Sequence, residues 1–300
     1  MINIKSKVIW MVVLAVIMIA AGASFFSQRS TDRQIRISSN PWVGFTPFIY
    51  AQEKGWLEKT PFRFTWVVDL SENARLYERG FTQGFTATQY EMLHFKDYSH
   101  FRPMFLIDRS AGADVIMSNR SLEQLRKSQE TINVYLEMGS LNEDFFKAFV
   151  AENKLAALQF KLSDTSQKEV TQLSPNGAPV IVISYAPYST ELTKKGFMAV
   201  SSTAELQSFF VIDALFVDKR SISASAEEFK KLKSIFDKAL DALHSRPQEY
   251  YEVVHGYLEG QTYDEFMATT KQVEWLNQGD TSRYQRQLQL HKVITDRLIQ

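Results

Sequence analysis

The sequence predicts an α/β protein, and three observations support this fold class. From Ile35 onward, short apolar runs alternate with stretches of helical periodicity. After about Ser221 only helical periodicity remains, which predicts a helical C-terminal tail. The segment Val8–Phe26 is an apolar run without charge, which predicts an N-terminal hydrophobic helix. The length of 300 residues is enough for one large core or two modest ones.

The composition excludes several classes of protein. The chain has 34 basic and 34 acidic side chains and a formal net charge of zero. No basic excess is therefore available to neutralise the phosphates of a nucleic acid. Cysteine is absent, which excludes disulfides, thiolate metal sites, cysteine nucleophiles and a lipid-modified N-terminal cysteine.

The first 26 residues have two interpretations, which the sequence leaves open. Two lysines precede the apolar run, and its small residues Ala21-Gly22-Ala23 are typical of a secretory signal cleaved after Ala23. The run of about 19 residues is also long enough to cross a bilayer as an uncleaved anchor. In both cases we expect the body of the protein in the periplasm, with residues 27–33 as a tether. If uncleaved, residues 8–26 would hold it at the inner membrane.

Strands are expected where short apolar or alternating segments are bounded by turn residues. These segments are 35–38, 63–68, 84–86, 104–108, 113–117, 131–136, 158–162, 180–184, 197–200 and 209–217. Helices are expected where capping residues open an amphipathic stretch. The expected helix starts are Thr46-Pro47, Thr88, Ser121 and Ser140 in the body, and Ser225, Ser245 and Thr262 in the tail.

Three of the expected helices begin directly after a strand, with glycine or small polar residues at the turn. These junctions lie at 38–46, 86–88 and 136–140. In open α/β sheets, ligands bind in the crevice beyond the carboxyl ends of the strands, where such loops converge. Each helix start offers unpaired N–H groups, which favour an anionic or strongly polar ligand atom.

Aromatic and acidic side chains near these junctions are candidate ligand contacts. Trp42 and Tyr185 could stack on a planar ligand or fill the core, and both interpretations stay open. Asp108 and Asp213 each interrupt an apolar strand, where a carboxylate is costly unless it is paired. A cationic ligand group, Arg109 or a helix start would supply the partner.

The sequence lacks the motifs of catalysis. The five histidines show neither HExxH spacing nor another metal-ligand pattern. There is no GxSxG elbow, Walker loop or GxGxxG motif. We therefore expect a protein that is not an enzyme and that uses no cofactor or metal.

Six segments, in order along the chain, resemble motifs of one protein family. They are 40–57 (N-P-W-V-G-F, then E-K-G-W-L), 108–116 (D-R-S-A-G-A-D-V-I), 137–140 (E-M-G-S), 185–188 (Y-A-P-Y), 210–217 (F-V-I-D-A-L-F-V) and 247–249 (P-Q-E). The family is the nitrate/sulfonate/taurine and thiamine-pyrimidine class of ABC-transporter substrate-binding proteins. The resemblance covers nearly all of residues 35–255.

The resemblance implies a two-lobed type II periplasmic-binding-protein fold. Lobe 1 would contain residues 34–117 and 205–300, and lobe 2 residues 118–204. Two crossings between the lobes would let them close on a ligand. Carried over position by position, the family's ligand contacts fall on Asn40, Trp42, Gly44, Thr88, Asp108, Gly139, Ser140, Tyr185 and Asp213.

Two segments depart from the family pattern. Gln83-Gly84-Phe85 replaces the usual acidic strand before Thr88, so the match at Thr88 rests on its position alone. Tyr185 and Ala186 replace the tryptophan and glutamate of W-E-P-Y, which changes the expected ligand. The helix starts favour an anion, whereas Asp108, Glu137 and Asp213 favour a cation or an N–H-rich heterocycle.

The resemblance implies capture of a small organic molecule for uptake through an ABC permease. A first alternative is a membrane-tethered sensor of the same fold that acts on a signalling protein in the membrane. A second is an enzyme of the related pyrimidine-precursor synthase branch, which depends on a cysteine-rich motif. The absence of cysteine argues against that branch.

Overall fold

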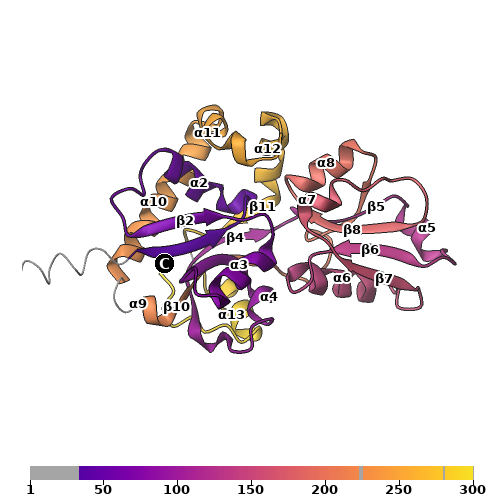
Figure 1. Cartoon of the computed structure of the whole chain (residues 1–300), viewed down its shortest axis with the longest axis horizontal. Helices are drawn as coiled ribbons and strands as arrows, with labels where there is room; N and C mark the ends of the chain where they lie inside the picture. Colours follow the sequence, from indigo (N-terminus) through magenta and orange to yellow (C-terminus); the bar gives the residue numbers. More distant parts are fainter. Residues whose placement is uncertain (1–33, 223–225, 280, 300) are drawn as a thin grey trace, which may run out of the picture.

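The computed structural model describes residues 34–222, 226–279 and 281–299, so the apolar run at 8–26 lies outside it. Within these ranges no helix has the length and apolar character needed to span a membrane. The described residues form two α/β lobes, each built on its own mixed sheet (Figure 1). This arrangement confirms the predicted α/β fold with two lobes. We call the part with the six-stranded sheet lobe 1 and the part with the five-stranded sheet lobe 2.

The sheet of lobe 1 has the strand order β11-β4-β10-β3-β1-β2. Its strands are β1 (Ile35–Ser39), β2 (Phe62–Trp66), β3 (Gly84–Thr88), β4 (Phe101–Ser110), β10 (Ile212–Asp218) and β11 (Val273–Trp275). Strand β1 pairs in parallel with β2 and β3, whereas β10 runs antiparallel between β3 and β4. The carboxyl ends of β1 and β3 therefore lie at one edge of the sheet, where the first two junction loops begin.

The helices of lobe 1 pack on both faces of this sheet. They are η1 (Val43–Phe45), α2 (Thr46–Glu53), α3 (Leu70–Glu78), α4 (Gln89–Met92), η2 (Tyr98–His100), α9 (Lys219–Ile222), α10 (Ala226–Ser245), α11 (Pro247–Val254), η3 (His255–Tyr257), α12 (Tyr263–Thr269), η4 (Thr270–Gln272) and α13 (Ser282–Leu290). The apolar stripe of α10 packs against α2, where the ring centroids of Phe48 and Phe236 are 5.0 Å apart. The tail therefore completes lobe 1.

The prediction that the tail contains only helices is wrong. Strand β11 lies within it and pairs antiparallel with β4, with Trp275 opposite Asp108. This strand has only three residues, which is too short for a period-2 pattern to show in the sequence. Its extended form depends on pairing with the edge of the sheet and not on local propensity.

Most of the predicted helix starts are confirmed by their caps. Thr88, Ser121 and Thr262 each form a complete capping box with the residue three positions later. The predicted cap at Ser245 is wrong, because α11 has Arg246 at its N-cap and the Ser245 hydroxyl donates to the Asp241 carbonyl instead. Ser225 lies outside the described residues.

The sheet of lobe 2 has the strand order β7-β6-β8-β5-β9. Its elements are β5 (Asp114–Ser118), α5 (Leu122–Arg126), β6 (Ile132–Leu136), α6 (Leu141–Glu152), β7 (Phe160–Asp164), α7 (Gln167–Val170), β8 (Val180–Tyr185), α8 (Tyr188–Lys194) and β9 (Met198–Ser202). The sequence places β5 in lobe 1, but this strand pairs antiparallel with β8 and β9 in lobe 2. The chain therefore passes from lobe 1 to lobe 2 between Ser110 and Asp114.

The two crossings between the lobes contact each other. The hydroxyls of Ser110 in the first crossing and Thr203 in the second are 2.7 Å apart. The backbone N–H of Gly112 also donates to the Thr203 hydroxyl, at 2.9 Å. The two connections are therefore joined side by side.

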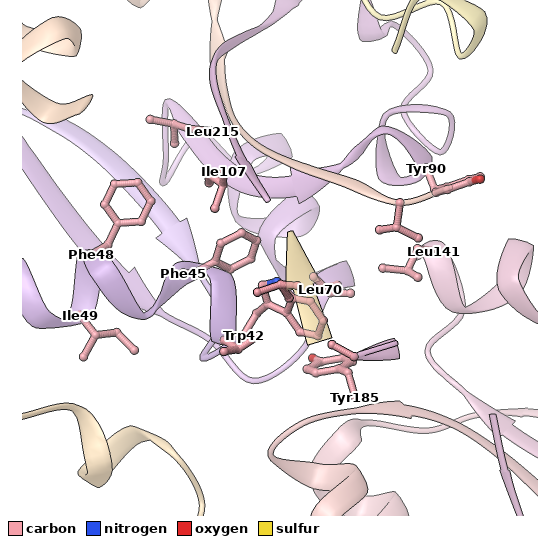
Figure 2. Packing of buried hydrophobic residues seen from close by; sticks show 14 of the residues in the cluster. Trp42, Phe45, Phe48, Ile49, Leu70, Tyr90, Ile107, Leu141, Tyr185 and Leu215 are labelled. Atoms are coloured by element: carbon pink, nitrogen blue, oxygen red, sulfur yellow. The ribbon is translucent and has the colours of Figure 1, made fainter. Parts of the chain in front are cut away.

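A continuous apolar cluster extends from lobe 1 into lobe 2 (Figure 2). Trp42 and Leu70 of lobe 1 lie against Tyr185 of lobe 2, and the rings of Trp42 and Tyr185 meet edge to face at 5.6 Å. Phe209, in the second crossing, stacks on Tyr90 of lobe 1 and on Phe145 of lobe 2. The lobes are therefore in a closed arrangement.

Candidate functional site

A small cavity lies between the two lobes, with about 10 Å³ accessible to the centre of a water molecule. Its walls come from both lobes and from the second crossing. The lining residues are Asn40, Trp42, Leu70, Thr88, Val211 and Asp213 on one side and Asp114, Leu141 and Tyr185 on the other. Each is at most 6% exposed, so the cavity is separated from solvent. A molecule held there touches both lobes.

The cavity lies where the three predicted junctions meet. Asn40 and Trp42 follow the end of β1, and Thr88 is both the end of β3 and the N-cap of α4. Leu141 is the first residue of α6, after the end of β6. The convergence expected from the sequence is therefore present in the structure.

Five of the residues singled out in the sequence line the cavity: Asn40, Trp42, Thr88, Tyr185 and Asp213. Two more, Asp108 and Gly44, lie behind Trp42. The indole N–H of Trp42 donates to Asp108 Oδ2 at 3.3 Å. A Cβ atom on Gly44 would lie 1.6 Å from the same oxygen, so only glycine leaves room for this pair.

The remaining two residues, Gly139 and Ser140, do not line the cavity. The N–H of Gly139 donates to Glu143 Oε2 at 3.1 Å. The Ser140 hydroxyl donates to the Glu137 carbonyl and accepts from the N–H of Asn142. Both residues therefore shape the turn into α6 and position Leu141.

The sequence interpretation missed four lining residues: Leu70, Asp114, Leu141 and Val211. The three apolar residues carry no signal that separates them from ordinary core residues. Asp114 is different, because it is the second aspartate of the D-R-S-A-G-A-D-V-I segment and the first residue of β5. A carboxylate at the start of a buried strand was a signal that could have identified it.

Several buried oxygen atoms at this site have no hydrogen-bond partner among the described residues. They are Asn40 Oδ1, Asp108 Oδ1, Asp114 Oδ2 and Asp213 Oδ2. The amide nitrogen of Asn40 is already engaged, because it donates to the Tyr185 hydroxyl at 3.2 Å. Of the residues that the structure describes, no lysine, arginine or histidine lines the cavity. The site is therefore rich in acceptors and poor in donors.

Burial raises the pKa values of these carboxyl groups. Burial, together with the charge of Glu91, raises the pKa of Asp114 to about 7. Asp108 and Asp213 are directly opposite each other on β4 and β10. Burial, and then the charge of neighbouring carboxylates, raises the pKa of each of them above its ordinary value. At neutral pH the site therefore retains protons that exposed carboxylates would have lost.

Arg109, one of the three partners considered for Asp108, is directed elsewhere. Its guanidinium pairs with Glu274 at 3.2 Å and lies 4.4 Å from the centre of the Phe210 ring. Within the described ranges, Asp108 is held only by the Trp42 indole and by its contact with Asp213. The carboxyl groups of the site thus have no cationic side chain to pair with.

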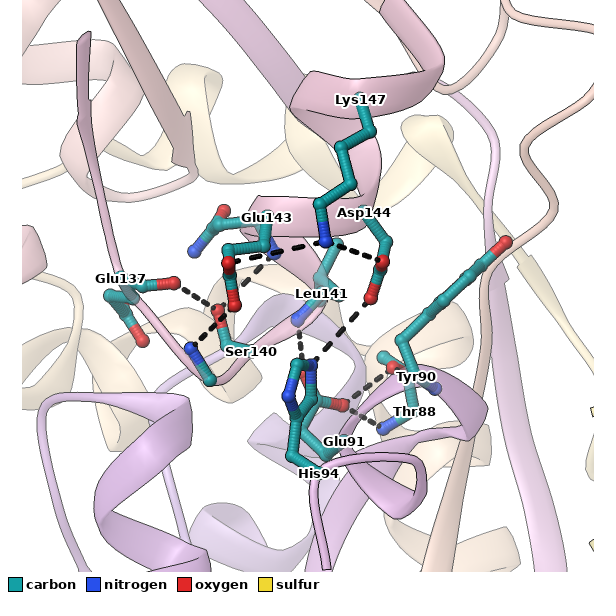
Figure 3. Close-up of polar contacts among 12 residues, drawn as sticks. Thr88, Tyr90, Glu91, His94, Glu137, Ser140, Leu141, Glu143, Asp144 and Lys147 are labelled. Atoms are coloured by element: carbon teal, nitrogen blue, oxygen red, sulfur yellow. Dashed lines mark hydrogen bonds and ion pairs between the residues drawn. The ribbon is translucent and has the colours of Figure 1, made fainter. Parts of the chain in front are cut away.

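The helix starts at the cleft are occupied by carboxylates of the opposite lobe. Glu91 of lobe 1 accepts a hydrogen bond of 2.6 Å from the N–H of Leu141, at the start of α6 (Figure 3). Glu137 of lobe 2 accepts one of 2.9 Å from the N–H of Leu70, at the start of α3. Because these N–H groups already donate to carboxyl groups of the protein, they are not available to hold an anionic ligand, which the helix starts alone would favour.

The comparisons with known proteins identify the fold. No protein-family model matches the sequence, and neither does any curated protein. Solved structures do match, among them the ligand-binding component of an ABC-type import system from Staphylococcus aureus with zinc bound. It has a TM-score of 0.68 and 12% identity and covers 89% of this chain and 96% of its own.

Two further structures show the same similarity. The alkanesulfonate-binding protein SsuA from Xanthomonas axonopodis pv. citri, bound to MOPS, has a TM-score of 0.66, 10% identity and coverage of 88% and 95%. A Candida albicans gene product described as having the generic periplasmic binding protein fold has a TM-score of 0.63, 10% identity and coverage of 88% and 91%. The chain therefore has the periplasmic binding protein fold.

Proposed function

We propose that this chain is a periplasmic solute-binding protein that holds a small organic molecule between its lobes and delivers it to an ABC permease. The observation that carries the proposal is the enclosed cavity whose walls come from both lobes. A binding protein of an import system has the same two-lobed fold. The protein binds the molecule without changing it chemically.

Binding of the solute would drive closure of the two lobes. A solute that contacts Asn40 and Asp213 on one lobe and Asp114 and Tyr185 on the other gains its full binding energy only when the lobes meet. The open state lacks half of these contacts. Binding therefore shifts the population toward the closed shape, which is the form that a permease would recognise.

The test is a screen of small solutes by melting temperature, followed by small-angle X-ray scattering of the purified protein. A ligand stabilises the folded state by mass action, by about 2.7 kcal/mol at a concentration of one hundred times Kd. We expect one chemical class to raise the melting temperature and to reduce the radius of gyration. Trp42→Ala should abolish both effects, and a melting shift that survives this substitution would place binding outside the cavity.

The transport role has a separate test. Disruption of the gene should abolish cellular uptake of the solute found in the screen. Permease and ATPase genes beside this gene would agree with that result. Uptake that continues at the normal rate would contradict delivery to a permease while leaving solute binding intact.

A further inference from the structure

We propose that the cavity selects a small organic cation with several N–H donors, such as an amidinium, and rejects anions. This inference rests on the proposed function and specifies the class of solute. The residues that would contact the cation are Asn40, Asp114 and Asp213. Asp114 is the central one, because it is the only acidic side chain that lobe 2 contributes to the cavity lining in the described structure.

The unpartnered atoms around the cavity are all oxygens, and those of the carboxyl groups are acceptors once the groups are ionised. Asn40 Oδ1, Asp114 Oδ2 and Asp213 Oδ2 belong to lining residues that are at most 3% exposed. A buried acceptor without a donor destabilises the folded protein, because it has lost its hydrogen bonds to water. A ligand with several N–H groups removes this cost at three points, whereas a ligand that carries only acceptors leaves all three unpaired.

The charge of the site favours the same class of ligand. Three carboxyl groups, those of Asp108, Asp114 and Asp213, lie in or directly behind the lining, and no basic side chain of the described structure joins them there. An amidinium offers parallel N–H bonds that match the two oxygens of a carboxylate. The aromatic side chains of Trp42 and Tyr185 also line the cavity, and aromatic rings are a favourable environment for a cation.

Anions are excluded by the occupied helix starts. The N–H of Leu141 donates to Glu91 (Figure 3). The N–H of Leu70 donates to Glu137, and both donors belong to lining residues. The N–H and hydroxyl of Thr88 also donate to Glu91. The donors that would hold a sulfonate or a carboxylate are thus already used by carboxyl groups of the protein.

The lining favours an organic cation over a metal ion. Across the described ranges, no group of three or more histidine, aspartate or glutamate side chains is arranged to hold a metal. Apolar lining from Leu70, Leu141 and Val211 also suits a molecule with a carbon skeleton. The small size of the cavity also limits the ligand to a small one.

Two matched series of probes test the proposal with the purified full chain. The first is acetamidinium, acetamide and acetate, and the second is benzamidinium, benzamide and benzoate. Within a series the three molecules have nearly the same shape and differ in charge and in donors. Isothermal titration calorimetry at pH 8 should show that the amidinium binds at least 10-fold more tightly than the amide, and that the carboxylate does not bind.

Variants connect the binding to the proposed residues. Asp114→Asn keeps the size of the side chain and removes its charge, and we expect it to weaken amidinium binding at least 10-fold. Asp241→Asn, on the exposed face of α10, is the matched control and should leave the affinity unchanged. Equal effects of the two substitutions would overturn the role of Asp114.

The possible failures can be told apart. Suppose that a carboxylate or a neutral probe binds as tightly as its amidinium and loses this binding in Trp42→Ala. That result would overturn the proposed cation class but would agree with the proposed solute-binding function. If neither the probes nor any solute of the screen changed the melting temperature or the radius of gyration, both proposals would be overturned.

Discussion

Glu91 Oε1 in lobe 1 lies 2.6 Å from the backbone nitrogen of Leu141 in lobe 2 and accepts its hydrogen bond. The opposite arrangement also occurs, because Glu137 of lobe 2 accepts from Leu70 of lobe 1. Each lobe thus places a carboxylate at a helix start of the other. These bonds join the two lobes and stabilise the closed arrangement.

Removal of the Glu91 side chain should therefore open the protein. Hydrogen bonds to a charged group contribute about 1.5–3 kcal/mol, and Glu91→Ala removes the bond between Glu91 and Leu141, which is one of those that cross the cleft. We expect a larger radius of gyration in small-angle X-ray scattering and a lower melting temperature. The matched control is Gln124→Ala, which removes the equivalent member of the capping box of α5 within lobe 2. A radius of gyration that stays unchanged in Glu91→Ala would show that this bond does not hold the lobes together.

Substitution of Gly44 should disrupt the site through its contact with Asp108. The Cβ of Gly44→Ala would lie 1.6 Å from Asp108 Oδ2 and 2.8 Å from Trp42 Nε1, so the buried pair must move. Overpacking of this kind costs about 1–3 kcal/mol. Chemical denaturation should show this loss, whereas Gly256→Ala, where a Cβ meets no atom within 4 Å, should change the stability by less than about 0.5 kcal/mol. Equal stabilities of the two variants would contradict the steric argument.

The stability of the ligand-free protein should fall as the pH rises from about 4 to about 7. Burial raises the pKa of Asp114 to about 7, compared with about 3.9 in an unfolded chain. Below pH 4 both states carry the proton. Between the two pKa values only the folded state keeps it, so each pH unit costs up to about 1.4 kcal/mol for this group.

Asp114→Asn is the test of this pH dependence. The neutral amide does not titrate, so the free energy of unfolding of the variant should fall less steeply across the window than that of the parent protein. Part of the pH dependence of the free energy of unfolding should remain in this variant, because burial also raises the pKa values of Asp108, Asp213 and Glu137. Asp241→Asn should retain the full slope. Parallel curves for Asp114→Asn and the parent protein would place the titration elsewhere.

Amidinium binding should have the opposite pH dependence. A cation favours the ionised carboxylates, so it must displace the protons that burial retains on Asp114 and its neighbours. The affinity for benzamidinium should therefore rise from pH 5 to about pH 8 and then level off. Calorimetry in buffers with different ionisation enthalpies should detect released protons at pH 6. Affinity that is independent of pH would indicate that the carboxyl groups do not contact the probe.

Features that depend on residues close together in the sequence could be predicted, whereas contacts between distant segments could not. The capping box of Thr88 and Glu91 was predicted, because its residues are three positions apart. The second oxygen of Glu91 bonds to Leu141, 50 residues away, and no local pattern encodes that contact. Strand β11 was missed for the same reason, since its form depends on a distant partner.

The joined hydroxyls of Ser110 and Thr203 also limit how the two halves of the molecule can move. Two independent connections would permit sliding and twisting as well as opening. Because the two crossings are linked, they bend together and act as one hinge. Rotation of one lobe relative to the other about an axis near this pair is then the easiest movement. A single distance between the lobes would then report the whole movement. It could be measured between spin labels on the exposed residues Leu93 of lobe 1 and Met138 of lobe 2.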